Sequence, residues 1–188
     1  MSMVLEQAIS LIRQKLTEKS PLIVALEGGA ATGKTTLAAQ LAKHFQAPVI
    51  SMDEFFLPPS LRTPARFSEP GGNIHYERFD EEVAAPLRAG NAFSYRIFDC
   101  SQMDFHGEKH IALCPLILVE GVYSLHPRYR DIYDLRLFLK TDPQIQNARL
   151  KERGEWLYGR FQKDWLPMEK MYFDAFQPEK ICDAILTT

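Results

Sequence analysis

Few cysteines and no run of like charges are found in this sequence. Its three cysteines, Cys100, Cys114 and Cys182, lie far apart and without CxxC spacing, which argues against a disulfide framework or a zinc site. The 22 Lys and Arg are interspersed among 24 Asp and Glu, for a formal net charge of -2. Such a chain lacks the basic run that attracts duplex nucleic acid or an anionic membrane. We therefore expect three reduced thiols, and neither nucleic acid nor a membrane as a partner.

Long apolar runs are also missing. Residues 1–6 lack the positive segment and apolar stretch of a secretion signal, and no later run approaches the length of a bilayer-spanning helix. The 188 residues, 46% of them hydrophobic, suit one ordinary domain with a buried core. We expect a single cytoplasmic domain over residues 1–188, and the sequence leaves open whether it forms a homo-oligomer.

The apolar residues that are present follow a pattern of alternating strands and helices. Apolar runs typical of strands buried on both faces of a parallel sheet fall at 22–26, 48–51, 116–120 and 135–140, and a last strand is expected at 181–186. Apolar residues at helical spacing fall at 5–19, 35–45, 142–153 and 156–176, and Pro127 opens a short helix at 128–132. This alternation predicts an α/β fold.

The segment between the second and third strands has a different composition. Residues 56–72 are rich in Pro, Arg, Ser and Gly and show no period, which indicates a long loop facing the substrate. Two further elements are expected here, a helix capped by Asp80 and a β-hairpin that pairs 95–98 with 105–112. We interpret residues 54–112 as an insertion that binds the substrate.

One string of residues carries a specific chemical signal. It reads Gly28-Gly29-Ala30-Ala31-Thr32-Gly33-Lys34-Thr35, which is GxxxxGKT, and Thr36 follows. Between a strand and a helix, the backbone N–H groups of such a turn point inward, and the helix dipole favours a bound phosphate. A Cβ at Gly28 or Gly33 would obstruct the turn or the approach of the phosphates. Lys34 would reach the β- and γ-phosphates and the Thr35 hydroxyl would ligate Mg²⁺, so residues 28–36 are predicted to bind Mg-ATP.

The class of phosphate-loop protein is narrowed by what accompanies the loop. The alternative to a phosphate-binding loop is a glycine-rich turn with an incidental lysine and no ligand. The strand before the turn and the helix after it disfavour this alternative. The guanine-reading NKxD string is absent, which argues against a GTPase. Motor and transporter ATPases need further domains to move, for which a chain of this length has no room. A small-molecule kinase fits its size.

Such a kinase needs a carboxylate that orients or deprotonates the attacking hydroxyl. Asp53 directly follows the second buried strand, at the sheet edge where ligands gather in parallel α/β folds. Glu120 ends the third strand and is placed to hold Mg²⁺ together with Thr35 and Asp53. Either acid alone could be a loop carboxylate or a helix cap. Two acids at strand ends beside one phosphate loop favour a functional role.

Three arginines are candidates for a lid that would cover the phosphates. Arg149 and Arg153 are four residues apart on one helix face, and Arg160 follows in a segment with glycines on both sides. We expect a lid over about 150–162. A solvated basic stripe is the alternative for each arginine.

In these motifs the sequence resembles the uridine kinase branch of P-loop kinases, whose relatives include nicotinamide riboside kinase, pantothenate kinase and phosphoribulokinase. The resemblance covers most of the chain and rests on GGAATGKTT at 28–36, SMDEFF at 51–56, ILVEGVYSLHP at 117–127 and Thr141-Asp142-Pro143 through Arg149 and Arg153. It implies a three-layer α/β/α sandwich with five parallel strands in the order 2-3-1-4-5. It also implies Asp53 as catalytic base beside Lys34, Glu120 as an Mg²⁺-associated acid, and an arginine lid at 149–160.

The acceptor side departs from the uridine kinase pattern. The family's Asn-aromatic-Asp sequence is replaced by Asn73-Ile74-His75-Tyr76, which lacks the acid expected to grip a ribose, and Phe98-Asp99-Cys100 lacks the expected histidine after it. Candidate acceptor contacts are Phe56, His75, Tyr76, Arg78, Phe98 and Asp99. Trp165, Glu169 and Tyr172, spaced four and three apart on the last long helix, are interpreted as packing residues.

The sequence therefore predicts transfer of the ATP γ-phosphoryl group to a hydroxyl of a small molecule, with a nucleoside as the first candidate. Two alternatives stay open. One is a kinase for another metabolite, such as pantothenate or a sugar. The other is a nucleotide-binding regulator that hydrolyses ATP slowly and passes a conformational change to a partner protein.

Overall fold

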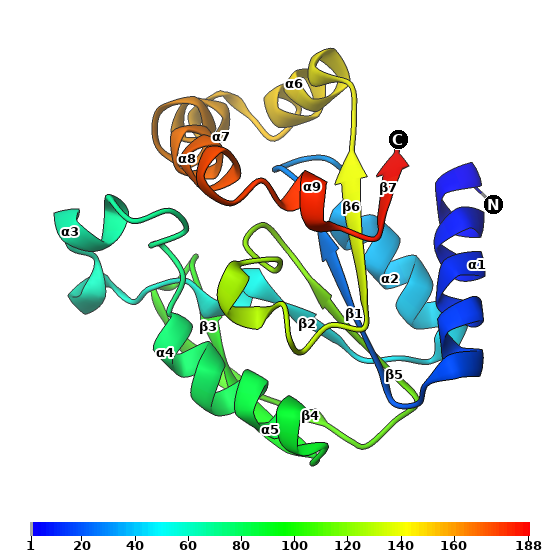
Figure 1. Cartoon of the computed structure of the whole chain (residues 1–188). Helices are drawn as coiled ribbons and strands as arrows, with labels where there is room; N and C mark the ends of the chain where they lie inside the picture. The colour runs from blue at the N-terminus through cyan, green and yellow to red at the C-terminus, as the bar shows by residue number, and fades with distance from the viewer. Residues whose placement is uncertain (1) are drawn as a thin grey trace.

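A five-stranded parallel sheet forms the centre of the computed structural model, which describes residues 2–188 (Figure 1). Its strands are β1 (Leu22–Glu27), β2 (Val49–Ser51), β5 (Leu116–Glu120), β6 (Leu135–Lys140) and β7 (Ala184–Thr187). They are ordered β2-β5-β1-β6-β7, and every neighbouring pair is parallel. Counted along the chain, these five strands lie in the order 2-3-1-4-5. The predicted fold class is confirmed.

The two central strands β1 and β5 are apolar up to a final glutamate because both of their faces are buried. Leu22, Val24 and Leu26 of β1 pack into a cluster with α1 (Met3–Glu18) and α2 (Lys34–Phe45). Ile23 and Ala25 face the opposite cluster, which contains the helices and hairpin between β2 and β5. Successive residues of a strand point to opposite faces, so a sheet covered on both sides shows no polar alternation.

The long helical segment near the C-terminus lies beyond the carboxyl ends of the strands. It consists of α7 (Glu155–Arg160), a π-helical turn (Phe161–Trp165) and α8 (Leu166–Phe176). It follows α6 (Pro143–Lys151), whose first turn is capped by the Asp142 side chain. Figure 1 shows α6, α7 and α8 gathered at the end of the sheet toward which β6 and β7 point. The predicted helices at 142–153 and 156–176 are confirmed.

The predicted β-hairpin is present between β2 and β5, and it is longer than expected. It pairs β3 (Phe93–Asp99) with β4 (Asp104–Ile111) in antiparallel register. The expected loop at 56–72 contains two short helical turns, a 3₁₀ turn at Pro59–Leu61 and α3 (Pro64–Phe67), each opened by a proline.

Three expected elements differ in their bounds from the structure. Asp80 does not cap a helix, because the helix already begins at Tyr76 and runs through α4 (Tyr76–Phe79), a π turn (Asp80–Ala84) and α5 (Ala85–Ala89). The helix expected at 128–132 is a single 3₁₀ turn over Pro127–Tyr129. The last strand begins at Ala184 and not at residue 181, because Pro178 opens α9 (Pro178–Ile181).

The cysteines and the helix lengths bear on two expectations from composition. Among residues 2–188, all three cysteines are free thiols. Over the same range, the longest helices are too short or too polar to cross a bilayer.

Candidate active site

The phosphate loop joins β1 to α2 in a tight turn that requires glycine. Gly33 immediately precedes α2 and has φ of 98°. A Cβ on Gly28 would clash with the Leu139 carbonyl oxygen. The Thr32 hydroxyl donates to the Gly29 carbonyl at 2.9 Å and fixes the turn from inside. The turn therefore has the strand-to-helix geometry that the GxxxxGKT motif predicts.

Lys34 lies buried inside this turn. Its Nζ donates to the Gly29 carbonyl at 2.8 Å, and only 7% of the residue is exposed. Burial lowers the pKa of Lys34, and carboxylates nearby oppose that shift. Thr36, one residue beyond the motif, is exposed on the first turn of α2. The ammonium group is thus held against the backbone of the loop.

A hydroxyl and a carboxylate meet where α2 starts. Oγ1 of Thr35 lies 3.4 Å from Oε2 of Glu120, whose Oε1 accepts a hydrogen bond from Ser51 at 2.8 Å. Ser51 and Glu120 are register partners at the ends of the neighbouring strands β2 and β5. Burial raises the pKa of Glu120, and the Ser51 hydrogen bond opposes the shift. These oxygen groups suit a small hard cation such as Mg²⁺.

Asp53 follows β2 in a 3₁₀ turn at Met52–Phe55. Its side chain is exposed, and none of the described residues donates a hydrogen bond to the carboxylate. Neighbouring residues partly desolvate the carboxylate, which raises the pKa of Asp53. The charges of Lys34 and Arg153 oppose this rise. Asp53 thus lies two residues beyond Ser51, which is hydrogen-bonded to Glu120, and its oxygens can accept a hydrogen bond from a ligand.

Two helices hold the phosphate loop from outside. From α6, Gln146 Nε2 donates to the Ala30 carbonyl at 2.7 Å, and Arg149 Nη1 donates to the Ala31 carbonyl at 3.2 Å. From α8, Glu169 Oε2 accepts the Ala30 N–H at 3.0 Å. The interpretation of Glu169 as a packing residue is wrong. The position of Glu169 on its helix could not predict this contact, because Ala30 lies 139 residues away in the sequence.

The three predicted lid arginines have different surroundings. Arg149 contacts the loop carbonyls. Arg153 lies over the Phe161 ring at 5.4 Å, and its positive charge opposes the rise that desolvation causes in the pKa of Asp53. Arg160 pairs with Asp164 at 2.6 Å on the surface of its own helix. The structure thus holds Arg149 against the phosphate loop, places Arg153 over Phe161 and pairs Arg160 with Asp164.

Glu27, at the end of β1, is a buried acid that the sequence reasoning missed. Its Oε1 accepts the Tyr123 N–H at 3.1 Å, and its Oε2 accepts the Leu125 N–H and the Tyr172 hydroxyl, the latter at 3.0 Å. Burial raises the pKa of Glu27 to about 7, and these hydrogen bonds oppose a larger shift. Tyr123 has φ of 77°, an unusual value for a tyrosine. Glu27 therefore fixes the loop after β5 against β1 and α8. A signal was available, because Glu27 ends an otherwise apolar run.

Several candidate acceptor residues are engaged within the protein. The buried Arg78 guanidinium donates to the carbonyls of Glu54 and Arg96, the latter through Nη1, and so ties α4 to the hairpin. Asp99 accepts hydrogen bonds from Ser101 inside the hairpin turn. These contacts hold Arg78 and Asp99 within the fold of the insertion.

The other candidates lie nearby without such partners. Phe98 is buried against the Phe105 ring, and Phe56 forms an isolated antiparallel bridge with Ile74. Tyr76 is buried, and its hydroxyl has no hydrogen-bond partner among residues 2–188. The Nδ1 atom of His75 also has no hydrogen-bond partner among residues 2–188. Their role toward an acceptor remains a prediction.

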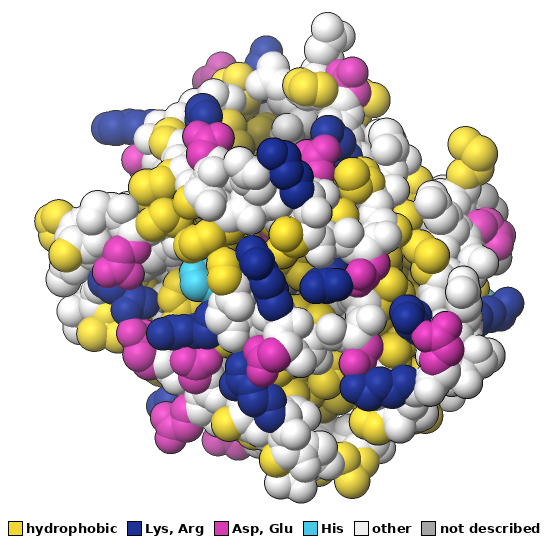
Figure 2. Space-filling model, viewed as in Figure 1, with side chains coloured by type: hydrophobic (Ala, Val, Ile, Leu, Met, Phe, Trp, Pro, Cys, Tyr) yellow, Lys and Arg dark blue, Asp and Glu magenta, His cyan; other side chains and the backbone are white. Residues whose placement is uncertain are grey.

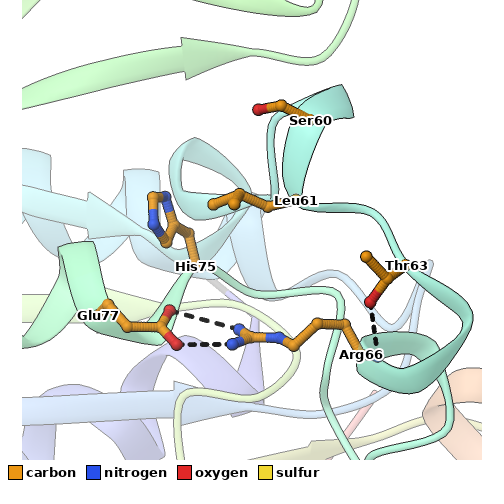
Figure 3. Close-up of a pocket in the computed structure, with 6 residues that line it drawn as sticks. All are labelled: Ser60, Leu61, Thr63, Arg66, His75 and Glu77. Carbon is orange, nitrogen blue, oxygen red and sulfur yellow. Dashed lines mark hydrogen bonds and ion pairs between the residues drawn. The ribbon is translucent and has the colours of Figure 1, made fainter.

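A cavity of about 460 Å³ opens in the connection between β2 and β5 (Figure 3). Its lining consists of Ser60, Leu61, Thr63, Arg66, His75 and Glu77. Arg66 crosses it and pairs with Glu77 at 2.6 Å. The lining includes His75 but neither Asp53 nor any residue of the phosphate loop. The cavity is therefore separate from the predicted reaction centre.

One face of the molecule carries charges of both signs. Figure 2 shows Lys and Arg side chains interspersed with Asp and Glu over the face in view. On this face no broad area of a single charge forms, as the sequence composition predicts.

Comparison with known proteins places this geometry among kinases. No family model matches the chain. It is 28% identical over 151 residues to uridine kinase-like protein 4 of Arabidopsis thaliana, which covers 76% of this chain and 32% of that protein. It is 25% identical over 177 residues to uridine kinase of Leuconostoc citreum, which covers 85% of this chain and 83% of that protein. The chain thus spans about a third of the length of the plant relative and most of the bacterial one.

A solved structure supports the fold. The protein described as a possible uridine kinase from Bacillus stearothermophilus superposes with a TM-score of 0.73 at 19% identity, covering 98% of this chain and 100% of that one. At this identity the likeness shows the fold alone. Together with the sequence relatives, it shows that the chain resembles uridine kinase-like P-loop kinases over most of its length.

Proposed function

We propose that this chain, a relative of uridine kinase-like P-loop kinases, transfers the γ-phosphoryl group of ATP to a hydroxyl of a small molecule, with a nucleoside as the first candidate. One observation carries the proposal. At the carboxyl edge of the parallel sheet, Thr35 of the phosphate loop meets Glu120 of β5, and Asp53 follows the end of the neighbouring strand β2. The similarity to proteins named uridine kinase supports the nucleoside class.

The residues present fit Mg-ATP. Gly33, with its positive φ, and the buried Lys34 form a turn suited to phosphate. Residues 2–188 contain no cluster of three acidic, His or Cys side chains able to hold a metal by themselves. Mg²⁺ in kinases is held by one or two protein groups together with substrate phosphates, and Thr35 with Glu120 would supply them. Bound Mg-ATP would bring the phosphoryl group and a cation that shields its charge.

The chain's own side chains would prepare the acceptor hydroxyl. Asp53 would accept the hydroxyl hydrogen at its carboxylate, which orients the oxygen and takes its proton as it attacks phosphorus. The raised pKa of Asp53 makes it a stronger base than an ordinary aspartate. Lys34, and Arg153 from the lid, would balance the negative charge that spreads over the transferred group. Closure of the lid would exclude water, which otherwise competes with the acceptor.

An acceptor screen tests the proposal. Purified protein with Mg-ATP is offered nucleosides, pantothenate and sugars, and ADP release is followed. We expect ADP release that depends on one class of acceptor and is abolished by Lys34→Ala. A rate of ADP release that is the same with and without every acceptor would contradict a kinase and favour the regulatory ATPase. Stimulation by pantothenate or a sugar alone would keep the kinase and replace the nucleoside.

A further inference from the structure

Ala30 of the phosphate loop is held on both sides by side chains from two helices. Its N–H donates to Oε2 of Glu169 in α8 at 3.0 Å, and its carbonyl accepts a hydrogen bond from Nε2 of Gln146 in α6 at 2.7 Å. The first bond is buried and the second is partly buried. A Cβ on Gly29 would lie 3.0 Å from the same Gln146 nitrogen, closer than ordinary van der Waals contact, so glycine leaves room for this donor.

The two peptide groups that meet at Ala30 point in opposite directions. In a trans peptide the N–H and the C=O point to opposite sides. Between Gly29 and Ala30, the N–H faces α8 and the Gly29 carbonyl turns into the loop, where Lys34 Nζ donates to it at 2.8 Å. In the next peptide group the Ala30 carbonyl faces α6, so the Ala31 N–H is directed away from α6. Among residues 2–188 this N–H has no backbone partner.

The next two peptide groups keep this orientation. Arg149 Nη1 of α6 donates to the carbonyls of Ala31 and Thr32, at 3.2 and 3.3 Å. The Thr32 N–H accordingly points inward, to the Gly29 carbonyl at 3.4 Å. Ala31 has φ of 57°, a left-handed conformation that alanine adopts only where its surroundings impose it. Successive N–H groups on one side of a turn form the concave site that binds phosphate in such loops.

We propose that Gln146 and Glu169 are positioning residues, whose hydrogen bonds orient the peptide groups on either side of Ala30 so that the loop presents amides to phosphate. The proposal rests on the proposed function, because it takes the loop to be a nucleotide site. Without the Gln146 donor, the peptide group between Ala30 and Ala31 can rotate and turn its carbonyl toward the ligand. A carbonyl oxygen repels a phosphate oxygen, so only the molecules that keep the original orientation bind well. Glu169 acts here as an acceptor, for which its charge is not required.

Calorimetric titration of the full chain with nucleotides tests the proposal. The ligands are Mg²⁺ with ADP and Mg²⁺ with the non-hydrolysable ATP analogue AMP-PNP. Gln146→Met keeps the length of the side chain and removes the donor. Glu169→Met removes the acceptor, whereas Glu169→Gln keeps an oxygen that can accept the Ala30 N–H. Gln144→Met is the matched control, because Gln144 lies exposed two residues earlier on α6. Thermal unfolding of each variant checks that it is folded.

We expect Gln146→Met and Glu169→Met to bind both nucleotides about tenfold more weakly than wild type, because each has lost one bond that orients the loop. Glu169→Gln and Gln144→Met should each lose less than about twofold in affinity.

Wild-type affinity in folded Gln146→Met would overturn the proposal and leave the kinase intact, and this holds even where Glu169→Met does not fold. A loss in Glu169→Gln as large as in Glu169→Met would overturn the role of Glu169 as an acceptor, because charge would then be what matters. Absence of nucleotide binding in wild type and variants alike would overturn both this proposal and the proposed function.

Discussion

Thr35 at the start of α2 and Glu120 at the end of β5 meet across the sheet edge, with 3.4 Å between Oγ1 and Oε2. They are 85 residues apart in the sequence. Their approach follows from topology, because β5 pairs with β1 in parallel and both strands end beside the phosphate loop. A hydroxyl and a carboxylate in this position are the oxygen ligands that a magnesium nucleotide requires.

Replacement of Glu120 by Gln is expected to weaken the response to Mg²⁺. An amide binds a divalent cation less well than a carboxylate, so the Mg²⁺ concentration for half-maximal ADP release should rise about 10- to 100-fold. A Mg²⁺ titration at fixed ATP measures this. Ser51→Ala, which removes only the hydrogen bond to Glu120, is the control and should shift the midpoint less. The same midpoint in Glu120→Gln and wild type would remove Glu120 from the metal site.

Asp53→Asn is expected to lower kcat by about 10² to 10⁴ while Mg-ATP binding stays nearly unchanged. The amide keeps the size of the side chain and can no longer accept the proton of the acceptor hydroxyl. Turnover with the acceptor found in the screen and AMP-PNP binding are measured on the same preparation. Glu54→Gln, one residue along the chain, is the control, because the Glu54 carboxylate already accepts a hydrogen bond from Tyr95 within the protein. Full turnover by Asp53→Asn would exclude Asp53 as the base.

The elements that sequence reasoning located correctly are those with a local cause. The strand at 22–26 and the GxxxxGKT turn after it are specified by consecutive residues, and the observed β1 and α2 agree with them. Strand-end residues such as Asp53 and Glu120 could be placed near the loop, because parallel strands share one carboxyl edge. This shared edge was enough to predict that both acids lie near the phosphate loop.

The contacts that sequence reasoning missed join distant parts of the chain. Glu169 reaches Ala30 across 139 residues, and Glu27 reaches Leu125 across 98, which no local pattern encodes. Asp80 had the residue type of a cap, but burial of Tyr76 and Phe79 starts the helix earlier. Tertiary packing decided each of these cases.

Arg153 and Arg160 are expected to differ in their contribution to catalysis. The charge of Arg153 acts on Asp53, so Arg153→Ala should lower kcat about tenfold or more. Arg160 is paired with Asp164 on the surface, so Arg160→Ala should change kcat less than about twofold. Steady-state turnover of the two variants checks this. Equal losses would mean that both arginines act as the lid, as the sequence suggested.

Two buried titratable groups are expected to oppose each other in the pH dependence of stability. Burial raises the pKa of Glu27 from 4.5 to about 7. Between these values the folded state holds a proton that the unfolded state has lost, so stability falls as the pH rises. Burial among aromatic rings lowers the pKa of His126 from 6.5 to about 4. Over that window the unfolded state holds the extra proton, so stability rises with pH.

His126→Gln should expose the contribution of Glu27. In wild type the two slopes largely cancel between pH 4.5 and 6.5, because each group alone contributes up to about 1.4 kcal/mol per pH unit with opposite sign. Without His126, the free energy of unfolding should fall relative to wild type by about 1 kcal/mol per unit as the pH rises through this range. Urea unfolding of both proteins at pH 4.5, 5.5 and 6.5 measures the difference, and contributions from all other groups cancel in it. Parallel curves for the two proteins would show that His126 has the same affinity for protons in the folded and unfolded states, and that its ring stack does not hold it neutral.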